Sequence, residues 1–284
     1  MSQYAVSIKD ALLIANTQLV NSDSDQLDSE VLLAYVLKDV RTFLRAWPEK
    51  LLTNQQRLQY MSLIDQRKHG QPVAYLTGER AFWSHTFHVN SSVLIPRPDT
   101  ELLIETVLNT IDTNKAIDMA DLGTGSGAIA ICLGLEYPHA VITAVDQSSD
   151  ALVVAEKNAK RLHCHNVRFL QSNWFDNLDG ATFDIIISNP PYIDKADQHL
   201  QEGDVRYEPK AALIAGEHGL QDIGRITSQA KHWLKDNGFL LLEHGFEQSN
   251  QVKTLLESHG YQHIQQFRDI QGHLRATLCQ FNHS

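Results

Sequence analysis

The fold is decided by residues 117–136, IDMADLGTGSGAIAICLGLE, where an apolar strand leads through a glycine-rich turn into an apolar helix. Gly123, Gly125 and Gly127 tolerate the backbone dihedral angles of a tight turn and let a ligand approach the backbone closely. The helix behind them offers unpaired N–H groups to a carboxylate or a phosphate. The segment therefore predicts a ligand-binding turn, and a tight strand-to-helix turn without a ligand is the alternative.

Strands and helices alternate from about residue 116 onward. Five short apolar runs are expected to be strands: Ile117–Leu122, Val141–Val145, Val167–Leu170, Phe183–Ser188 and Phe239–Glu243. Three segments between them are expected to be helices: Ala128–Glu136, Asp150–Leu162 and Gln221–Leu234. This alternation predicts an α/β fold, a mostly parallel sheet with helices on both faces. Two further runs, Gln265–Asp269 and Arg275–Phe281, are expected to close the sheet as an antiparallel pair.

The first 72 residues show only helical patterns, in four segments: Ser7–Val20, Leu27–Leu37, Thr42–Trp47 and Thr53–Lys68. Ser7 with Asp10 and Thr53 with Gln56 have the spacing of capping boxes. We expect a small helical bundle that serves folding or docking and carries no chemistry.

Residues 73–96 are rich in aromatic and β-branched side chains, among them Phe82, Trp83 and Phe87, which predicts a β-hairpin. Pro96-Arg97-Pro98 then forces an extended stretch before a helix that begins near Thr100. The expected organisation is a helical domain over 1–72, a β-hairpin linker over 73–96 and an α/β domain over 97–284.

The composition of the 284 residues, 43% hydrophobic and 20% charged, is that of an ordinary globular protein. A net charge of −10 disfavours binding to bare nucleic acid, which needs a basic surface, and suits a basic protein partner. The chain has no run of about 18 apolar residues and no secretory signal, so we expect no membrane partner and a cytoplasmic location. Three scattered cysteines predict no disulfide framework, and His163-Cys164-His165 is expected at the surface without a metal.

The glycine spacing is G-x-G-x-G and not the dinucleotide G-x-G-x-x-G, which favours S-adenosylmethionine over NAD. Asp146 stands at the carboxyl end of the next strand, where an acidic side chain can accept hydrogen bonds from both ribose hydroxyls. Its alternative role is structural, beside the start of a helix. Trp174 follows the third strand, where the adenine ring is expected. It would stack on that ring or pack beside it, or serve as a plain core tryptophan.

Residues 183–192, FDIIISNPPY, end an apolar strand directly in Asn189-Pro190-Pro191-Tyr192. Ligands of open α/β sheets bind at this carboxyl edge. The two prolines stiffen the loop and remove two N–H donors, so that the carbonyls before them are fixed and free to accept. An entering NH2 group would meet the side-chain oxygen of Asn189 and the carbonyl of Pro190, and Tyr192 would offer its ring for stacking. The pattern predicts methyl transfer to a planar amide or amine nitrogen, and a rigid loop without chemistry is the alternative.

An amide nitrogen is a poor nucleophile because its lone pair is delocalised into the carbonyl, the resonance behind the rotation barrier of about 18–20 kcal/mol in a peptide bond. Hydrogen bonds to both N–H groups would hold the nitrogen and favour pyramidal geometry as the lone pair turns toward the methyl carbon, in line at roughly 3–3.5 Å. No strong general base is needed, because the methylated nitrogen becomes acidic and loses its proton readily. Positioning and local electrostatics would carry the catalysis.

Taken together, these residues resemble the PrmC/HemK family, the N5-glutamine methyltransferases of peptide chain release factors. The resemblance extends over most of the chain and rests on these stretches: Gln71–Gly78, Ile95–Glu101, Asp121–Gly127, Asn189–Tyr192, Tyr207–Pro209, Ala212-Leu213 and Gly219-Leu220. The tetrapeptide alone is shared with adenine N6-methyltransferases. Its combination with the helical amino-terminal region and the Ile95–Glu101 segment is far more specific.

The resemblance implies a class I S-adenosylmethionine-dependent methyltransferase fold, Rossmann-like with a seven-stranded mostly parallel sheet, and a helical domain that docks the release factor. It implies transfer to the glutamine of the Gly-Gly-Gln motif of that factor. The residues implied to contact the cofactor are Gly123, Thr124, Gly125, Ser126, Gly127, Asp146, Trp174 and Asn189. Those implied to hold the substrate glutamine are Asn189, Pro190, Pro191 and Tyr192, of which Asn189, Pro190 and Tyr192 are the catalytic candidates.

Two other functions remain open. An adenine N6-methyltransferase acting on DNA or RNA shares the chemistry, but it needs a basic groove and an extruded base, and the acidic composition counts against it. A non-catalytic cofactor-binding scaffold is disfavoured by the intact Asn189–Tyr192 tetrapeptide.

Two further segments have more than one interpretation, and a third is expected to be structural. Ile193–His218 is long for a connection, and we expect a lid, a partner-contact loop or a segment disordered without its partner. Pro98-Asp99-Thr100 would line the cofactor pocket or start a helix. Glu243-His244-Gly245 is expected to have a structural role at the end of its strand.

Overall fold

The computed structural model describes residues 6–20, 24–178 and 180–283. They form two compact units, one within Met1–Gly78 together with Glu202–Tyr207, the other within Glu79–Gln201 and Glu208–Ser284. We call them the helical unit and the sheet unit. Over the described ranges, every helix is too short or too polar to cross a membrane.

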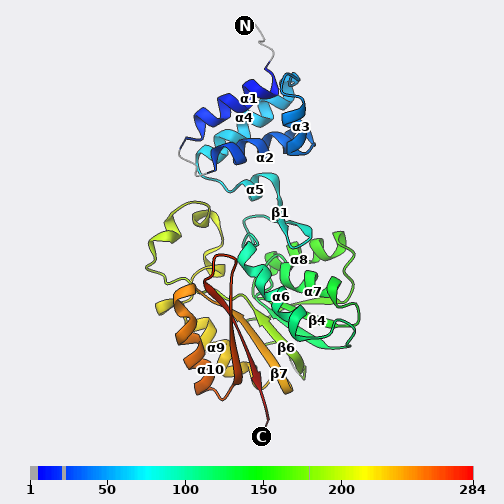
Figure 1. Ribbon diagram of the computed structural model, residues 1–284, viewed down its shortest axis with the longest axis vertical. Helices are drawn as coiled ribbons and strands as arrows, with labels where there is room; N and C mark the ends of the chain where they lie inside the picture. The colour runs from blue at the N-terminus through cyan, green and yellow to red at the C-terminus, as the bar shows by residue number, and fades with distance from the viewer. Residues whose placement is uncertain (1–5, 21–23, 179, 284) are drawn as a thin grey trace. The chain divides into compact units, whose positions relative to one another are not determined.

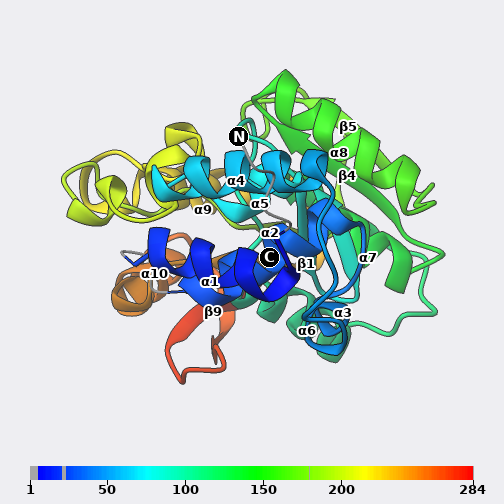
Figure 2. The same ribbon diagram turned by 90° about the horizontal axis from the view of Figure 1, so that it is seen from above.

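The helical unit contains α1 (Ile8–Gln18), α2 (Asp25–Leu37), α3 (Arg41–Ala46), α4 (Asn54–Lys68) and α5 (Val73–Thr77), drawn in blue to cyan in Figure 1. Both predicted capping boxes are present, with Ser7 Oγ accepting from Asp10 N and Thr53 Oγ1 from Gln56 N, each at 3.2 Å. Figure 2 shows α1, α2 and α4 side by side. Their facing side chains form one apolar core, which includes Ile8, Leu32, Leu33, Tyr60 and Ile64. The predicted bundle is confirmed.

The segment Glu202–Tyr207 belongs to this unit although it is distant in sequence. Arg67 lies between two carboxylates, donating from Nε to Asp28 Oδ2 at 2.7 Å and from Nη1 to Asp204 Oδ1 at 2.5 Å. The hydroxyl of Tyr207 donates to the carbonyl of His69, just after α4. Polar contacts therefore hold this segment at the carboxyl end of α4.

The β-hairpin is shorter than predicted. Strand β1 (Glu79–Phe82) pairs antiparallel with β2 (His85–His88), and Val73–Thr77 forms α5 instead. The carbonyl of Pro72 accepts the N–H groups of two residues in the first turn of this helix, and Gly78 ends it with a φ of 72°. The predicted start of the hairpin at residue 73 is wrong, because it was based on composition alone. A proline before the segment and a glycine after it can hold β-branched and aromatic residues in a short helix. The two units divide after Gly78, inside the expected linker.

The sheet unit is built on seven strands in the order β5-β4-β3-β6-β7-β9-β8. Their bounds are β3 (Asp118–Leu122), β4 (Val141–Asp146), β5 (Val167–Gln171), β6 (Phe183–Ser188), β7 (Leu234–Glu243), β8 (Gln262–Arg268) and β9 (Leu274–Phe281). The strands β5, β4, β3, β6 and β7 pair in parallel, and β9 is antiparallel to both of its neighbours. The predicted seven-stranded mostly parallel sheet is confirmed.

Helices cover both faces of the sheet (Figure 1). On one face lie α6 (Glu101–Thr110), α7 (Ala128–Glu136) and α8 (Ser149–Arg161), and on the other α9 (Gln221–Ala230) and α10 (Ser249–Ser258). Successive side chains of β6 point to opposite faces of the sheet. Ile185 and Ile187 pack in the apolar cluster on the face of α6 and α7, and Ile186 packs in the cluster on the face of α9 and α10. Helix α10 was not predicted, although Val252 and Leu256 mark its buried face. The expected Gln221–Leu234 helix ends at Ala230, and Leu234 already begins β7.

The connection between β6 and α9 is structured, contrary to its appearance in the sequence. It contains four short 3-10 turns, η2 (Gln198–Gln201), η3 (Val205–Tyr207), η4 (Lys210–Ala212) and η5 (Glu217–Gly219). A bridge between Ile193 and Ile214 joins its ends. Short turns of this kind have no hydrophobic period, which is why the sequence did not reveal them.

Candidate active site

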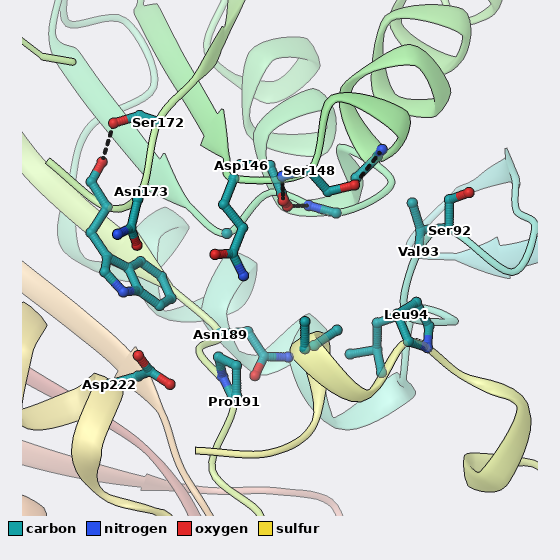
Figure 3. Close-up of a pocket in the computed structure, with 18 residues that line it drawn as sticks. Ser92, Val93, Leu94, Asp146, Ser148, Ser172, Asn173, Asn189, Pro191 and Asp222 are labelled. Atoms are coloured by element: carbon teal, nitrogen blue, oxygen red, sulfur yellow. Dashed lines mark hydrogen bonds between the residues drawn. The ribbon is translucent and has the colours of Figure 1, made fainter. Parts of the chain in front are cut away.

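A pocket lies at the carboxyl ends of the parallel strands β3, β4 and β6 (Figure 3). Adjacent parallel strands bring their last residues to one edge of a sheet, so the glycine turn, Asp146 and Asn189 meet there. Six predicted residues line the pocket: Gly123, Gly125, Asp146, Trp174, Asn189 and Pro191. Residues from distant segments complete the wall, among them Val93, Leu94, Pro209 and Ala212.

Asp146, the last residue of β4, is tied to the glycine turn. Its Oδ2 accepts the backbone N–H of Gly125 at 2.9 Å, and its Oδ1 accepts that of Ser148 at 2.9 Å. Burial raises the pKa of Asp146, and these backbone hydrogen bonds counteract the rise. A carboxylate has about four acceptor positions, so Asp146 can also accept from hydroxyl groups of a ligand in the pocket.

The remaining predicted residues of the glycine turn are not part of the pocket lining. Thr124 and Ser126 are buried, and the Thr124 hydroxyl donates to Asp121 at 2.6 Å. Gly127 begins α7 at a φ of 81°, and a Cβ there would lie 2.7 Å from Cδ1 of Ile131. These three residues therefore shape the turn and pack it against α7, while Gly123 and Gly125 border the pocket.

Trp174 forms one side of the pocket. Its ring edge lies 3.4 Å from the point that a Cβ on Gly123 would occupy. Burial raises the pKa of Asp222, and a hydrogen bond from the Trp174 side chain opposes that rise. The ring also packs against the apolar cluster under α9 and α10. Trp174 is thus both part of the core boundary and part of the pocket wall. Its contact with an adenine ring stays a prediction.

Asn189 follows β6 directly and lies in the pocket wall (Figure 3). Its Nδ2 donates to the hydroxyl oxygen of Thr100 at 3.1 Å. Because the two polar atoms of an amide point in different directions, this bond turns Oδ1 away from Thr100, where it can accept an N–H group. The geometry presents Asn189 as an acceptor, as the predicted chemistry requires.

Pro190 and Tyr192 do not line the pocket. Pro190 is buried, and Tyr192 is half-buried with its hydroxyl donating to Glu243 Oε1 at 3.2 Å. Burial raises the pKa of Tyr192, and the nearby Glu243 acts in the same direction, so the hydroxyl stays protonated. Stacking of a substrate on the Tyr192 ring stays a prediction.

Several residues of the site were missed or misassigned from the sequence. Thr100 was expected at a helix start or in the pocket wall; it stands at the start of α6, and its hydroxyl oxygen also accepts the side chain of Asn189, which the sequence did not indicate. Glu243 was expected only to close the sheet, yet it binds Tyr192. Asp222 was not singled out at all. For Glu243 a signal was available, because it is an acidic residue at the end of an apolar strand, as Asp146 is.

The connection after β6 supplies part of the pocket wall, held in place by Glu208. The Glu208 side chain is fully buried, its Oε2 accepts the backbone N–H of Ile95 at 3.0 Å, and Arg97 forms an ion pair with Oε1. Pro209, the next residue, lines the pocket. The motif stretches at 95–101 and 207–209 therefore meet in the structure because one anchors the other.

The residues around the pocket fit S-adenosylmethionine. A Cβ on Gly125 would meet no atom within 4 Å, so the backbone of the turn is open to a ligand. Asp146 retains acceptor positions for ribose hydroxyls, and Trp174 offers an apolar surface beside them. The open backbone, the carboxylate and the apolar surface together suit a nucleoside with an adjoining polar group.

Two family descriptions match the chain, the PrmC N-terminal domain over residues 10–78 and the Methyltransferase small domain over residues 98–254. A protein from Salmonella typhimurium is 47% identical over 267 residues, which cover 94% of this chain and 96% of the relative. One from Vibrio cholerae is 47% identical over 282 residues, covering 98% of each chain. Both are named release factor glutamine methyltransferase.

Solved structures show the same fold. A methyltransferase from Pyrococcus furiosus superposes with a TM-score of 0.54 at 18% identity, covering 79% of this chain and 98% of that one. At this identity the likeness concerns the fold and not the substrate.

Proposed function

We propose, from the premise that this chain belongs to the family of release factor glutamine methyltransferases, that it methylates the glutamine of the Gly-Gly-Gln motif in bacterial class 1 peptide chain release factors. The methyl group goes to the side-chain amide nitrogen, N5, and comes from S-adenosylmethionine. The near full-length similarity to relatives of that name supports the substrate. The enzyme acts in the cytoplasm, where release factors work.

One observation carries the chemistry. Asn189 directly follows β6; its side chain is oriented by Thr100 and lies in the same pocket as Gly125 and Asp146. An acceptor for an amide N–H therefore stands next to the groups that suit the cofactor. A binding scaffold would need the cofactor groups but not the oriented acceptor.

The protein's own residues work by holding the substrate nitrogen. Asn189 Oδ1 and the carbonyl of Pro190 accept the two N–H groups of the glutamine amide, which localises the lone pair on nitrogen. Bound S-adenosylmethionine supplies an electrophilic methyl group. The transferred methyl leaves the nitrogen positively charged, and one of its two protons is then lost to solvent. Orientation of the amide contributes most of the rate, because a well-positioned pair of reactants loses little further entropy on reaching the transition state.

The cofactor-binding roles follow the pocket. Asp146 accepts the ribose hydroxyls, Gly123 and Gly125 allow close approach of the backbone, and Trp174 lies beside the adenine. Thr124, Ser126 and Gly127 maintain the shape of the turn. Supporting this division, Asp146 is held by two backbone N–H groups that leave acceptor positions open.

The helical unit docks the release factor. Its match to the PrmC N-terminal domain supports this role. The net charge of −10 suits a basic partner.

The test is intact-mass spectrometry after mixing the protein with S-adenosylmethionine and a purified bacterial release factor, with duplex and single-stranded DNA and RNA as parallel acceptors. The proposal expects one added methyl, on the release factor. Methyl on adenine would assign the chain to the nucleic acid enzymes. Cofactor binding without transfer to any acceptor would indicate a scaffold.

A further inference from the structure

Glu243 is a buried carboxyl group behind the pocket. It is the last residue of β7 and 2% exposed. Ser188 at the end of β6 pairs with Leu242, so Glu243 stands beside the point where the tetrapeptide begins. Glu243 therefore lies next to the tetrapeptide Asn189–Tyr192, which is proposed to hold the substrate.

The carboxyl group connects with both ends of the tetrapeptide. At one end it accepts the hydroxyl of Tyr192 on Oε1 at 3.2 Å. At the other end it faces Thr100, whose hydroxyl oxygen accepts the Nδ2–H of Asn189 at 3.1 Å. Thr100 is also buried, with 5% of its surface exposed. The two end residues of the tetrapeptide are thus linked through one carboxyl group.

The environment of Glu243 is unfavourable for a charge. Burial raises its pKa to about 7, although hydrogen bonds from Thr100 and Tyr192 and the charge of Arg275 oppose the rise. Its Oε2 is buried and has no hydrogen-bond partner among the described residues. A buried carboxyl group with an unpaired oxygen destabilises a fold, so packing does not explain its presence.

The donors and acceptors along this chain of contacts fix the direction of the Asn189 amide. A threonine hydroxyl has one hydrogen, and a carboxylate can only accept. When that hydrogen is given to Glu243, Thr100 can offer Asn189 only a lone pair, so Nδ2 must face Thr100. Oδ1 then faces the substrate. Without the carboxylate, the hydroxyl can donate to Oδ1 instead, and the amide can turn its NH2 toward the substrate NH2.

We propose that Glu243 is a positioning residue for methyl transfer, which orients the Asn189 amide through Thr100 and holds Tyr192 directly. The inference rests on the proposed function and deepens it. Glu243 is not among the residues that line the pocket, so it acts through Thr100 and Tyr192. Its effect is on the rate of transfer and not on cofactor affinity.

The test compares E243Q and T100V with the wild-type enzyme, using kcat and KM for methylation of a purified release factor together with the Kd for S-adenosylmethionine. Glutamine is neutral and presents an NH2 group that can donate to the Thr100 oxygen, which leaves the Thr100 hydrogen free to be donated to Oδ1 of Asn189. We expect each variant to lower kcat about 10- to 100-fold and to change the cofactor Kd by less than about 3-fold. The double variant should be no slower than the slower single variant, because both break one chain of contacts.

Two controls make the result specific. T100S keeps the hydroxyl and should turn over faster than T100V. E105Q makes the same change on the exposed face of α6 and should behave as wild type. If E243Q does not fold, as thermal unfolding would show, T100V against T100S decides the question.

The inference is overturned if E243Q and T100V keep the wild-type kcat, if their losses multiply in the double variant, or if cofactor affinity falls as far as kcat. In those cases the wild-type enzyme still methylates the release factor. Failure of the proposed function looks different, because the wild-type enzyme itself then transfers no methyl, and this inference falls with it.

Discussion

Two buried glutamates, one in each unit, show how differently the same side chain is used. Glu30 in the helical unit is 5% exposed and accepts Nε of Arg41 at 3.0 Å and Nη2 at 2.6 Å, with Arg45 at 3.5 Å. Although burial acts to raise it, the pKa of Glu30 is lowered by hydrogen bonds from Arg41 and Gln26 and by the arginine charges. Among the described residues, the hydrogen bonds that Glu243 accepts come from hydroxyl groups, and burial raises its pKa to about 7.

The difference separates a stabilising carboxylate from one retained for the site. A buried carboxylate with a two-pronged arginine partner has its desolvation offset by charge. One that faces hydroxyl groups does not, so the fold tolerates it for another reason. The aspartates show the same contrast. Asp28 and Asp204 each pair with the charge of Arg67. Asp121, below the glycine turn, accepts the hydroxyl of Thr124, and burial raises its pKa to about 7.

The largest effect should come from the acceptor that Glu243 orients. N189A removes the Oδ1 acceptor, and loss of one preorganised polar group in a transition state typically costs about 10²- to 10³-fold in rate. We expect that loss in single-turnover methylation of the release factor, with cofactor binding by calorimetry largely unchanged. A matching loss of cofactor affinity would show that Asn189 belongs to the cofactor site instead.

The next effect concerns Asp146, a carboxylate used for binding. D146A should weaken S-adenosylmethionine by about 10- to 100-fold, since two charge-assisted hydrogen bonds are lost. Turnover at saturating cofactor should fall much less. D146N should bind better than D146A, because its amide oxygen still accepts. Equal loss of kcat and affinity would contradict the division between Asp146 and Asn189.

The two glutamates can be compared directly by the same substitution. E30Q should lower the free energy of unfolding by about 1–2 kcal/mol in urea titration, because its arginine partners are partly exposed and screened. Its turnover should equal that of wild type once folded. E243Q should show the reverse pattern, little or no loss of stability and slower turnover. If both variants lose stability and neither loses turnover, the two carboxyl groups are equivalent and the contrast is wrong.

The smallest effect is on pH dependence. Glu243 is faced by Asp99, Tyr192 and Arg275, and its pKa in the folded protein is about 7 against an ordinary 4.5. Below pH 7 Glu243 gains a proton and can donate it to the Thr100 oxygen, just as the NH2 group of a glutamine at this position could donate. The kcat of wild type should therefore decrease a few-fold from pH 8 to pH 6, and E243Q should lack this step.

The sign for stability follows from the same shift. A raised pKa means that the folded protein binds the proton more tightly than the unfolded chain, so this contribution is fully present below about pH 4.5 and is lost as pH rises through about 7. In denaturant titrations from about pH 4.5 to about pH 7, the free energy of unfolding should fall less for E243Q than for wild type. Identical curves would show that Glu243 does not titrate in this range.

Local patterns predicted the parts of the fold that depend on them. Ala128–Glu136 and Phe183–Ser188 were predicted with the bounds they have, because each is an apolar run bordered by glycine or proline. The helix at Val73–Thr77 was misassigned, since its start and stop outweigh its β-prone composition. The 3-10 turns after β6 have no periodic signal at all.

The site was predictable only where its residues adjoin a strand end in a motif. Asp146 and Asn189 both follow apolar strands, and both line the pocket. Glu243 reaches Tyr192 because β7 lies beside β6, with Ser188 opposite Leu242. Thr100 comes from the start of α6, far from Asn189 in sequence, and meets it only in the folded chain. Sequence order does not give the order of strands in the sheet, so contacts of this kind require the structure.

The most direct test of the central claim is tandem mass spectrometry of the Gly-Gly-Gln peptide after reaction of the wild-type enzyme with a release factor and S-adenosylmethionine. A release factor in which that glutamine is changed to asparagine serves as the matched acceptor. The account predicts one methyl group on the side-chain amide nitrogen of the glutamine and none on the asparagine variant. Methylation at any other residue, or equal methylation of both acceptors, would contradict it.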